Sequence, residues 1–339
     1  MSPEPSLEPL GFALLGCGLM GGRHAEVLSR LPGAALRCAF DSDPARLGEV
    51  CRRFGCRAAR SAEDAAADSS AGAVLVAAPS FLHAPMALLA AREGKHVLLE
   101  KPLANDAASG REVIARCAGA GVALSVISQK RFDPGALQLK AALGAGLLGR
   151  VFLAEVAINY YRDENYFRQA PWRASRVEAG GGVLMNQGIH YLDLLLWFLG
   201  PAAEVRGAVS TVREGYPEED VAAALIELEC GALATLTAST MTYPGFPETL
   251  TLYGSEGTCT IAEGKGVLRW EHKGKAPLPE PPLGPSLPEG LPPKLHAMYR
   301  NHWDFLRAVR EGEDPLIRPE EALAVVALIE KLYVDARDR

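Results

Sequence analysis

The cysteines of this chain follow neither of the two patterns that would give them a structural role. The seven cysteines, at positions 17, 38, 51, 56, 117, 230 and 259, include no Cys-x-x-Cys pair and have no neighbouring histidine cluster. An odd, scattered set argues against a disulfide framework. A structural zinc site would need closer, convergent ligands, and Cys51 with Cys56 lacks a second pair. We therefore expect reduced, buried thiols, no bound metal and a cytoplasmic location.

Membrane-length apolar stretches, dense basic blocks and an export signal are also lacking. No apolar stretch approaches the length of a membrane span. The net charge of −6 and the absence of a block rich in Lys and Arg argue against nucleic acid or an anionic membrane as partner. The start of the chain has neither the basic nor the apolar region of a signal peptide, so we expect a flexible tail over residues 1–10. The expected ligand is a small molecule.

The sequence pattern changes once along the chain, which predicts two domains. The chain has 339 residues, which is more than a domain with a single hydrophobic core normally contains. Up to about Val126, short apolar runs alternate with helical segments, as in a parallel sheet covered on both faces. The predicted strands are Phe12–Leu15, Ala35–Phe40, Ala73–Ala78, Val97–Leu99 and Val122–Val126, and the predicted helices are Gly22–Leu31, Pro44–Arg53, Ser61–Ala67, Ala84–Glu93 and Asp106–Ala118. This part, residues 11–127, is predicted to be an α/β domain.

Residues 128–339 are predicted to form an α+β domain with a mostly antiparallel sheet. Longer runs rich in β-branched residues occur there, with Gly and Pro between them at short intervals. The predicted strands are Val151–Tyr160, Val205–Val212, Val221–Leu228, Ala232–Met241, Glu248–Tyr253 and Val267–Trp270, and the predicted helices are Gly135–Leu143, Val183–Leu199 and Pro319–Arg337. Prolines recur between Ala276 and Pro293, which predicts a segment without regular structure.

Gly16, Gly18 and Gly21 lie between the first predicted strand and the first predicted helix. A dinucleotide pyrophosphate needs such a place, because the chain must turn sharply, the backbone must come close to the phosphates, and a helix N-terminus supplies free N–H groups. A second apolar run ends in Asp41, about 20 residues further on, where a carboxylate can accept hydrogen bonds from ribose hydroxyls. The pattern predicts a bound dinucleotide.

Asp41 also predicts which dinucleotide is preferred. An NADP-binding protein more often has a basic residue where Ser42 follows, and Asp41 would repel the 2′-phosphate of NADP. We therefore predict that NAD is preferred over NADP. The alternative is that the glycines form only a flexible turn and that Asp41 caps a helix ahead of Pro44.

Polar side chains follow two later strands of the predicted parallel sheet, where ligands bind. Ala78-Pro79-Ser80 leads to His83, and the strand Val97–Leu99 leads to Glu100-Lys101-Pro102. Lys101 is either an ordinary solvated lysine or a group that reaches the nicotinamide end of the cofactor. Pro102 can fix the direction of the Lys101 side chain, and a cis peptide is one way to do so.

A second set of polar residues lies on the predicted helix Val183–Leu199. Asn186, His190 and Asp193 have the spacing i, i+4, i+7 and share one face, whereas leucines and an isoleucine fill the other directions. A buried polar stripe needs partners. One interpretation is a core histidine that Asp193 satisfies. The preceding glycine triplet, Gly180-Gly-Gly182, can let a ligand approach the backbone and favours a substrate site.

Three motifs together resemble one family. They are Gly16-Cys-Gly-Leu-Met-Gly21, Glu100-Lys-Pro102 and Gly180-Gly-Gly-Val-Leu-Met-Asn-Gln-Gly-Ile-His-Tyr-Leu-Asp193. In this order and spacing they resemble the glucose-fructose oxidoreductase, inositol dehydrogenase and rhizopine-catabolism family, usually written Gfo/Idh/MocA. The resemblance implies an N-terminal Rossmann domain, a C-terminal domain with an open, mostly antiparallel sheet, and NAD(P)-dependent redox chemistry on sugars, sugar acids or cyclitols. It also implies homodimers or homotetramers formed through exposed sheet faces.

The resemblance assigns roles by position. Lys101 resembles the lysine that bonds the reacting hydroxyl, and His190 resembles the histidine that exchanges its proton. Several members have an aspartate where this chain has Asn186, so Asn186 is expected to orient substrate or cofactor, and inositol is a poor first guess. The predicted cofactor-binding residues are Gly16, Gly18, Leu19, Met20, Gly21, Asp41, Ser42, Pro79, Ser80, His83, Glu100, Lys101, Gln129, Trp172, Arg173 and Tyr299.

Aromatic and arginine side chains supply the predicted substrate contacts, because rings stack on sugar faces and arginine pairs with carboxylate or phosphate. The predicted substrate-binding residues are Tyr161, Arg168, Trp172, Asn186, His190 and Tyr191, with Tyr160 and Tyr166 as further candidates that can instead pack against the sheet. Arg168 together with Arg173 predicts a preference for acidic over neutral sugars.

The predicted activity is hydride transfer between the nicotinamide and a secondary hydroxyl of a sugar, sugar acid or cyclitol. His190 takes the hydroxyl proton and Lys101 stabilises the developing alkoxide. Two alternatives are an NAD-dependent glycoside hydrolase that oxidises its substrate transiently and a non-catalytic NAD-binding regulator.

Overall fold

The computed structural model describes residues 8–337, which form two compact units. Of the described residues, the first unit contains 8–104, 108–129 and 285–320, and the second contains 105–107, 130–284 and 321–337. The segment 285–320 therefore packs with the first unit although it follows most of the second in sequence. A domain boundary between residues 127 and 128 stays a prediction. Residues 1–7 of the predicted tail lie outside the described residues, and Leu10 already belongs to a strand.

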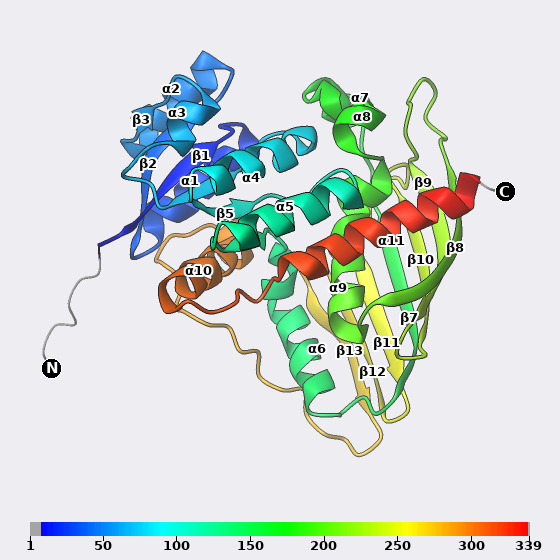
Figure 1. Cartoon of the computed structure of the whole chain (residues 1–339). Coiled ribbons are helices and arrows are strands. Elements are labelled where there is room, and N and C mark those ends of the chain that lie inside the picture. Colours follow the sequence, from blue (N-terminus) through cyan, green and yellow to red (C-terminus); the bar gives the residue numbers. More distant parts are fainter. Residues whose placement is uncertain (1–7, 338–339) are drawn as a thin grey trace, which may run out of the picture. The chain divides into compact units, whose positions relative to one another are not determined.

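The first unit contains a parallel sheet, as the sequence predicts (Figure 1). Across the described residues its six strands have the order β3-β2-β1-β4-β5-β6, and all neighbours pair in parallel. They are β1 (Leu10–Leu15), β2 (Ala34–Phe40), β3 (Arg57–Ala58), β4 (Ala73–Val76), β5 (His96–Leu99) and β6 (Leu124–Val126). The strand order reverses between β1 and β4, so the carboxyl ends of these strands mark the edge where ligands bind in such sheets.

The predicted helices of the first unit are present, and the sequence missed one. They are α1 (Leu19–Arg30), α2 (Pro44–Phe54), α3 (Ala62–Ala66), α4 (His83–Arg92) and α5 (Ala107–Gly119). The missed helix is α10 (His296–Glu311), whose Phe305 packs in the sheet core with its ring centroid 6.2 Å from that of Phe12. Polar residues occupy buried positions of α10, among them Asn301 and His302. They interrupt the apolar periodicity that would have predicted the helix.

The second unit contains a mixed, mostly antiparallel sheet, which also confirms the prediction (Figure 1). Its seven strands in the described chain have the order β13-β12-β11-β7-β10-β9-β8, and only β7 and β10 pair in parallel. They are β7 (Val151–Asn159), β8 (Ala202–Ser210), β9 (Val221–Leu228), β10 (Leu233–Ser239), β11 (Thr249–Gly254), β12 (Gly257–Ala262) and β13 (Gly266–His272). The sequence missed β12, a short strand that follows β11 after two residues.

The helix predicted over Val183–Leu199 is divided in the structure. A π-helical turn spans Leu184–Gly188, and the α-helix α9 spans Ile189–Leu199. The other helices of the second unit are α6 (Pro134–Gly144), α7 (Glu164–Arg168), α8 (Arg176–Ala179) and most of α11 (Pro319–Arg337). Helix α9 is buried in one large apolar core with strand β7 and helix α11, in which Leu195, Ile158 and Ile329 are fully covered. A π-helical turn inside a helix is frequent at functional sites.

Two further observations concern the secondary structure of the described residues. Residues 273–292 contain no helix or strand, as the prolines of that segment predict. None of the helices within residues 8–337 combines the length and the apolar character that crossing a membrane requires.

Candidate active site

The three glycines of the turn between β1 and α1 occupy three different environments. Gly16 has φ +100°, in the left-handed region, and its N–H donates to the Phe40 carbonyl at 2.8 Å. A Cβ at Gly21 would lie 1.9 Å from the carbonyl oxygen of Gly16, so the helix can approach the turn only with glycine there. A Cβ at Gly18 would meet nothing nearer than the Arg46 guanidinium at 4.0 Å. Space is thus left open at the glycine whose backbone faces the pyrophosphate in this kind of turn.

The start of helix α1 is available to an anion. Gly18 is the N-cap residue and provides no side-chain hydrogen bond to the first turn. Free N–H groups and the positive end of the helix dipole attract phosphate. Leu19, the first residue of the helix, exposes 72% of its surface. The turn therefore has the shape and the donors that a pyrophosphate needs.

Asp41 lies at the end of β2, beside this turn. Its Oδ2 accepts a hydrogen bond from Cys17 N at 2.7 Å, and its Oδ1 accepts one from Asp43 N at 2.8 Å. Helix α2 is capped by Asp43, which accepts from Ala45 N and Arg46 N, and not by Asp41. The alternative in which Asp41 is the helix cap is therefore wrong. Its two backbone donors fix the carboxylate, and each oxygen keeps a lone pair for a ligand hydroxyl.

The other cofactor-binding residues predicted in the first unit also follow its strands. Pro79, Ser80 and His83 come after β4, Glu100 and Lys101 after β5, and Gln129 after β6. Because these strands are parallel neighbours, their carboxyl ends lie at one edge of the sheet. Tyr299 lies instead on α10, 3% exposed, in an apolar cluster with Met20 and Val27. The roles of all these residues toward a cofactor stay predictions.

His83 and Glu100 hold the backbone on either side of Lys101. His83 is buried, with Nδ1 2.7 Å from the Pro102 carbonyl and Nε2 3.0 Å from the Ala78 carbonyl. Its burial lowers the pKa of the imidazole. Glu100 Oε2 accepts from Lys101 N at 3.1 Å, and the Lys101–Pro102 peptide is cis, the form that the sequence analysis considered. Glu100 Oε1 lies 2.9 Å from His24 Nε2, a residue that the sequence analysis missed.

The glycine triplet before His190 is required by packing within the protein. A Cβ at Gly181 would lie 2.1 Å from the Tyr333 hydroxyl, and one at Gly182 would lie 1.9 Å from the Glu219 carbonyl oxygen. The Glu219 carboxylate accepts from Gly182 N at 2.8 Å and from the Tyr333 hydroxyl at 2.6 Å. Access for a ligand is therefore not what these two glycines provide, which corrects the reason given from the sequence. They let the chain pack closely just before the π-helical turn.

The polar stripe of Asn186, His190 and Asp193 was expected to be buried, but only Asp193 is fully buried. Asn186 lies in the π-helical turn and His190 in the first turn of α9, and both are half-buried. Asp193 is buried, and its carboxylate accepts from Arg131 Nη2 at 2.6 Å and from Arg131 Nε at 2.8 Å. An arginine therefore satisfies Asp193, and no local sequence pattern pairs these two residues, which are 62 positions apart.

The hydroxyl groups of Tyr160 and Tyr191 bond to two neighbouring glutamates, of which Glu248 is buried and Glu263 is partly exposed. The Tyr191 hydroxyl donates to the Glu248 carbonyl at 3.1 Å, and the Tyr160 hydroxyl donates to Glu263 Oε2 at 3.3 Å. Lys130 Nζ lies 2.6 Å from Glu263 Oε1 and 3.9 Å from Glu248 Oε2. Burial and the charge of Glu263 raise the pKa of Glu248 to about 8, although Lys130 opposes the shift. Binding of substrate by Tyr191 stays a prediction.

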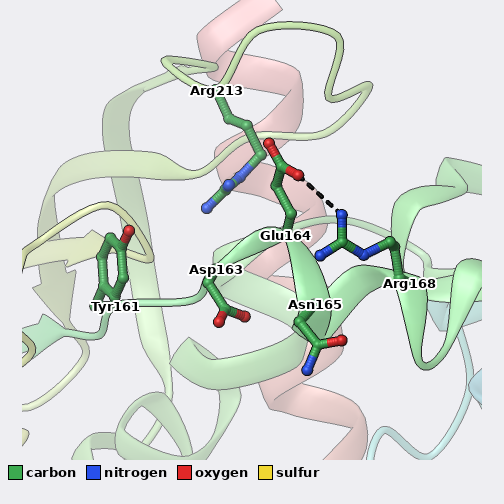
Figure 2. A pocket seen from close by; sticks show the side chains of 6 residues that line it. All are labelled: Tyr161, Asp163, Glu164, Asn165, Arg168 and Arg213. Atoms are coloured by element: carbon green, nitrogen blue, oxygen red, sulfur yellow. Dashed lines mark hydrogen bonds and ion pairs between the residues drawn. The ribbon is translucent and has the colours of Figure 1, made fainter.

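A pocket of about 350 Å³ in the second unit contains two predicted substrate-binding residues, Tyr161 and Arg168. Figure 2 shows its lining side chains, which are Tyr161, Asp163, Glu164, Asn165, Arg168 and Arg213. Arg168 pairs with Glu164 at 3.0 Å, and both side chains are largely exposed. Arg213 stacks 5.1 Å over the Phe167 ring and was missed by the sequence analysis. The pocket thus offers two cations, two carboxylates and one exposed ring.

Trp172 and Arg173 lie in a short 3-10 helix, Pro171–Ala174, next to this pocket region in the chain. Arg173 lies 4.3 Å over the Tyr166 ring and donates to the Tyr166 carbonyl at 3.1 Å. Its guanidinium also lies 5.5 Å over the Trp172 ring. Their contacts with a cofactor or substrate stay predictions. Within residues 8–337, no three or more side chains of His, Cys, Asp or Glu lie close enough together to hold a metal ion.

Comparisons with known proteins match both units. A family model described as "Oxidoreductase family, NAD-binding Rossmann fold" matches residues 10–128, and one described as "GFO/IDH/MocA C-terminal domain" matches residues 136–260. Among solved structures, the WlbA dehydrogenase from Bordetella pertussis, in complex with NADH and UDP-GlcNAcA, is 28% identical with a TM-score of 0.86. The similarity covers 98% of this chain and 97% of that chain.

Two curated relatives are dehydrogenases, one of a sugar and one of a cyclitol. The D-apiose dehydrogenase of Paraburkholderia graminis is 30% identical, over 96% of this chain and 87% of that protein. The scyllo-inositol 2-dehydrogenase (NAD(+)) of Bacillus subtilis is 28% identical, over 77% of this chain and 75% of that protein. These similarities extend over both units.

Proposed function

This chain belongs to the Gfo/Idh/MocA family of NAD-binding oxidoreductases, and on that premise we propose that it oxidises a secondary hydroxyl of an anionic sugar with NAD as the cofactor. Its relatives are dehydrogenases that act on CH–OH groups, so it is an oxidoreductase of that class. The observation that carries the proposal is the turn between β1 and α1. An open Gly18, an uncapped helix start and a fixed Asp41 carboxylate occur together there.

These residues fit NAD, which when bound supplies a nicotinamide ring that accepts a hydride. Gly16, Gly18, Leu19, Met20 and Gly21 would hold the pyrophosphate, and Asp41 with Ser42 would bind the adenosine ribose. Pro79, Ser80, His83, Glu100, Gln129 and Tyr299 are proposed to shape the rest of the cofactor site, together with Trp172 and Arg173. A preference for NAD over NADP follows from the charge of Asp41.

His190 and Lys101 are the proposed catalytic residues. The imidazole of His190 takes the proton of the substrate hydroxyl, because a hydride leaves the same carbon only as that proton is removed. The Lys101 amine donates a hydrogen bond to the developing alkoxide. Asn186 is proposed to orient the substrate through its neutral amide. Removing a general base costs roughly 10²–10⁴ in rate, so His190→Ala should lower kcat while NAD affinity is mostly retained.

An acidic sugar is the proposed substrate class. The pocket of Figure 2 presents Arg168 and Arg213, and Arg173 lies nearby in the sequence. The Arg168–Glu164 pair is exposed, and such pairs contribute only about 0–1 kcal/mol. A substrate carboxylate or phosphate can therefore replace Glu164 as the partner of Arg168 at little cost. A similar chain was solved with UDP-GlcNAcA, a nucleotide-linked sugar acid, which supports the same class.

A panel assay tests the proposal. The protein is incubated with NAD and with neutral hexoses, hexuronates, nucleotide-linked sugar acids and aryl glycosides, and NADH absorbance and released aglycone are read together. We expect NADH to form with one or more acidic sugars and not with their neutral parents. Release of aglycone without net NADH would identify a glycoside hydrolase, and NAD binding without either product would identify a regulator. Either result would overturn the proposal.

Self-association is part of the proposal. On the sheet face opposite the core of the second unit, Leu225 and Leu233 expose 41% and 43% of their surface on neighbouring strands. Burial of such apolar surface favours association. We expect a homodimer or homotetramer that uses this face, and light scattering coupled to gel filtration measures the mass. A cytoplasmic location stays a prediction.

A further inference from the structure

A chain of three buried titratable side chains runs behind Lys101. Glu100 Oε1 lies 2.9 Å from His24 Nε2, His24 Nδ1 lies 3.1 Å from His302 Nε2, and His302 Nδ1 lies 2.8 Å from the Met298 carbonyl oxygen. The two histidines are 0% exposed and Glu100 is 6% exposed. The three side chains come from α1, from the end of β5 and from α10, all within the first unit. None of the roles proposed above requires the two histidines.

The carbonyl at one end fixes the direction of the hydrogen bonds. The Met298 carbonyl only accepts, so His302 donates from Nδ1. Burial, and then the charge of His24, lowers the pKa of His302 well below its usual value, so His302 is neutral and its Nε2 accepts. His24 therefore donates from Nδ1 to His302. Its Nε2 faces the Glu100 carboxyl group, and one proton lies between those two atoms.

The pair of Glu100 and His24 carries no net charge in either position of that proton. With the proton on His24, an imidazolium faces a carboxylate, and with the proton on Glu100, both groups are neutral. Burial is the largest influence on the pKa of Glu100 and raises it, but the hydrogen bond and charge of His24 together with the charges of Lys101 and His83 outweigh burial, so the pKa is lowered and the carboxylate form is favoured. Lys101 and His83 also act on Glu100, and His302 lies next to His24 on the other side of the pair. A buried charge with a partner of this kind is held in one geometry.

The other oxygen of Glu100 reaches the backbone of Lys101. Glu100 Oε2 accepts from Lys101 N at 3.1 Å, while His83 Nδ1 lies 2.7 Å from the carbonyl of Pro102. Side chains thus hold the peptide unit before the Lys101 Cα and the peptide unit that follows Pro102. The direction of the Lys101 side chain follows from its backbone, and a displacement of about 1 Å in such a group can cost about 10²-fold in rate.

We propose that Glu100 and His24 are positioning residues for Lys101, and that the hydrogen-bonded chain from Met298 through His302 and His24 to Glu100 fixes the Lys101 amide. The inference rests on the proposed catalytic role of Lys101. It gives Glu100 a second role, as a support for the backbone of Lys101, in addition to its predicted place in the cofactor site. It also explains why α10, from a distant part of the sequence, packs in this unit beside α1.

Four substitutions separate the links of the chain. Glu100→Gln keeps both hydrogen bonds, since its amide donates to a neutral His24 and its oxygen accepts from Lys101 N, whereas Glu100→Ala removes both. His24→Gln places an amide where Nε2 was and keeps the link to Glu100. His24→Asn places an amide where Nδ1 was and keeps only the link to His302. His96→Asn is the matched control, because His96 begins the same strand β5 and its Nδ1 accepts from Ala123 N outside this chain of bonds.

Each variant is studied as the full chain loaded with NAD, after thermal melting has shown that it is folded. Hydrogen exchange of the peptide that contains Lys101 reports the amide directly and needs no substrate. The NAD dissociation constant and the kcat for a sugar that the unmodified protein oxidises are measured in parallel. If no sugar is oxidised, the proposed function fails, whereas the exchange measurement still tests the positioning of Lys101.

We expect Glu100→Ala and His24→Asn to speed exchange of the Lys101 amide and to lower kcat about tenfold or more. The NAD dissociation constant should change less than about threefold for His24→Asn, and for Glu100→Ala by a smaller factor than kcat. Glu100→Gln should recover most of both losses, His24→Gln should recover only part of them because it lacks the link to His302, and His96→Asn should show neither loss. Equal losses in the Gln and Ala variants of Glu100 would overturn the proposal. So would a rise in the NAD dissociation constant that matches the loss of kcat, because Glu100 would then act on the cofactor alone.

Discussion

The carboxylate of Asp193 is bound by the guanidinium of Arg131 through two hydrogen bonds of 2.6 and 2.8 Å. Both side chains are almost completely buried, with 4% and 1% of their surface exposed, and Arg131 also bonds Glu321 and stacks 5.4 Å over the Trp197 ring. Asp193 lies one turn after His190 on α9. The pair therefore ties the helix of the proposed catalytic base to the segment that precedes α6.

Loss of this pair should be costly. Removing one partner of a buried ion pair costs about 3–5 kcal/mol when it leaves the other charge uncompensated. Because Arg131 keeps Glu321 as a partner, we expect Asp193→Asn to lower the free energy of unfolding toward the lower end of that range in a urea titration. Arg168→Gln, which breaks the exposed pair with Glu164, is the control and should change it by less than about 1 kcal/mol. A loss below 1 kcal/mol for Asp193→Asn would contradict the role given to the pair.

Glu248 should make stability depend on pH. Its pKa is raised from 4.5 to about 8 by burial and by Glu263, so the folded protein keeps a proton there that the unfolded chain releases above about pH 4.5. The stability that this proton provides is complete below pH 4.5 and is lost as the pH rises to about 8, at about 1.4 kcal/mol for each pH unit.

The variant Glu248→Gln isolates this effect, because its amide does not titrate. The difference in unfolding free energy between the variant and the unmodified protein should grow in favour of the variant from about pH 5 to pH 8 and then stay constant. Urea titrations at several pH values measure it. A difference that does not change with pH would mean that Glu248 is ionised in the folded protein throughout this range.

Gly182 should not tolerate a methyl group. A Cβ there would lie 1.9 Å from the carbonyl oxygen of Glu219, which is backbone and cannot turn aside. We expect Gly182→Ala to lower the free energy of unfolding by about 1–3 kcal/mol or more. Gly48→Ala is the control, since Gly48 lies within α2 with nothing within 4 Å of its Cβ position. That variant should instead gain about 0.5–1 kcal/mol. Similar stability of the two variants would exclude close packing as the reason for the triplet.

Asp41 should set the choice between NAD and NADP. Its carboxylate lies beside the turn and would repel the 2′-phosphate of NADP. We expect calorimetric titration to show tighter binding of NAD, and Asp41→Asn to reduce the ratio of the two affinities about tenfold, which corresponds to about 1.4 kcal/mol. Asp43→Asn is the control, because Asp43 caps α2. Equal affinities for NAD and NADP in the unmodified protein would refute the predicted preference.

The fold could be predicted where local pattern decides it. The alternation of apolar runs and helices up to Val126 gave the parallel sheet, and β9 begins and ends at the predicted residues, Val221 and Leu228. Helix α10 could not be predicted in the same way, because its buried face includes Asn301 and His302. His302 has its partner in a distant part of the chain, because its Nε2 lies 3.1 Å from His24 Nδ1, and such a pairing leaves no local pattern.

The site could be predicted only as far as its motifs. The glycine turn, Asp41 and Lys101 follow strands and could be placed from the sequence, because strand ends of a parallel sheet share one edge. The partners could not be placed. Glu219 lies 37 residues from Gly182, and His302 lies 278 residues from His24, so neither pairing leaves a local pattern. The glycine triplet was noticed as a way for a ligand to approach the backbone, but Gly181 and Gly182 are explained by close packing against Tyr333 and Glu219.

The return of residues 285–320 to the first unit limits how this protein can be divided. A gene fragment that stops near residue 128 would encode every strand of the parallel sheet and yet omit Phe305, which covers Phe12 in its core. Such a fragment would expose the Phe12 ring to water and should aggregate. The nucleotide-binding unit therefore cannot be expressed as one continuous segment of the chain. To graft it onto another protein, an engineer would have to carry α10 along as a second piece.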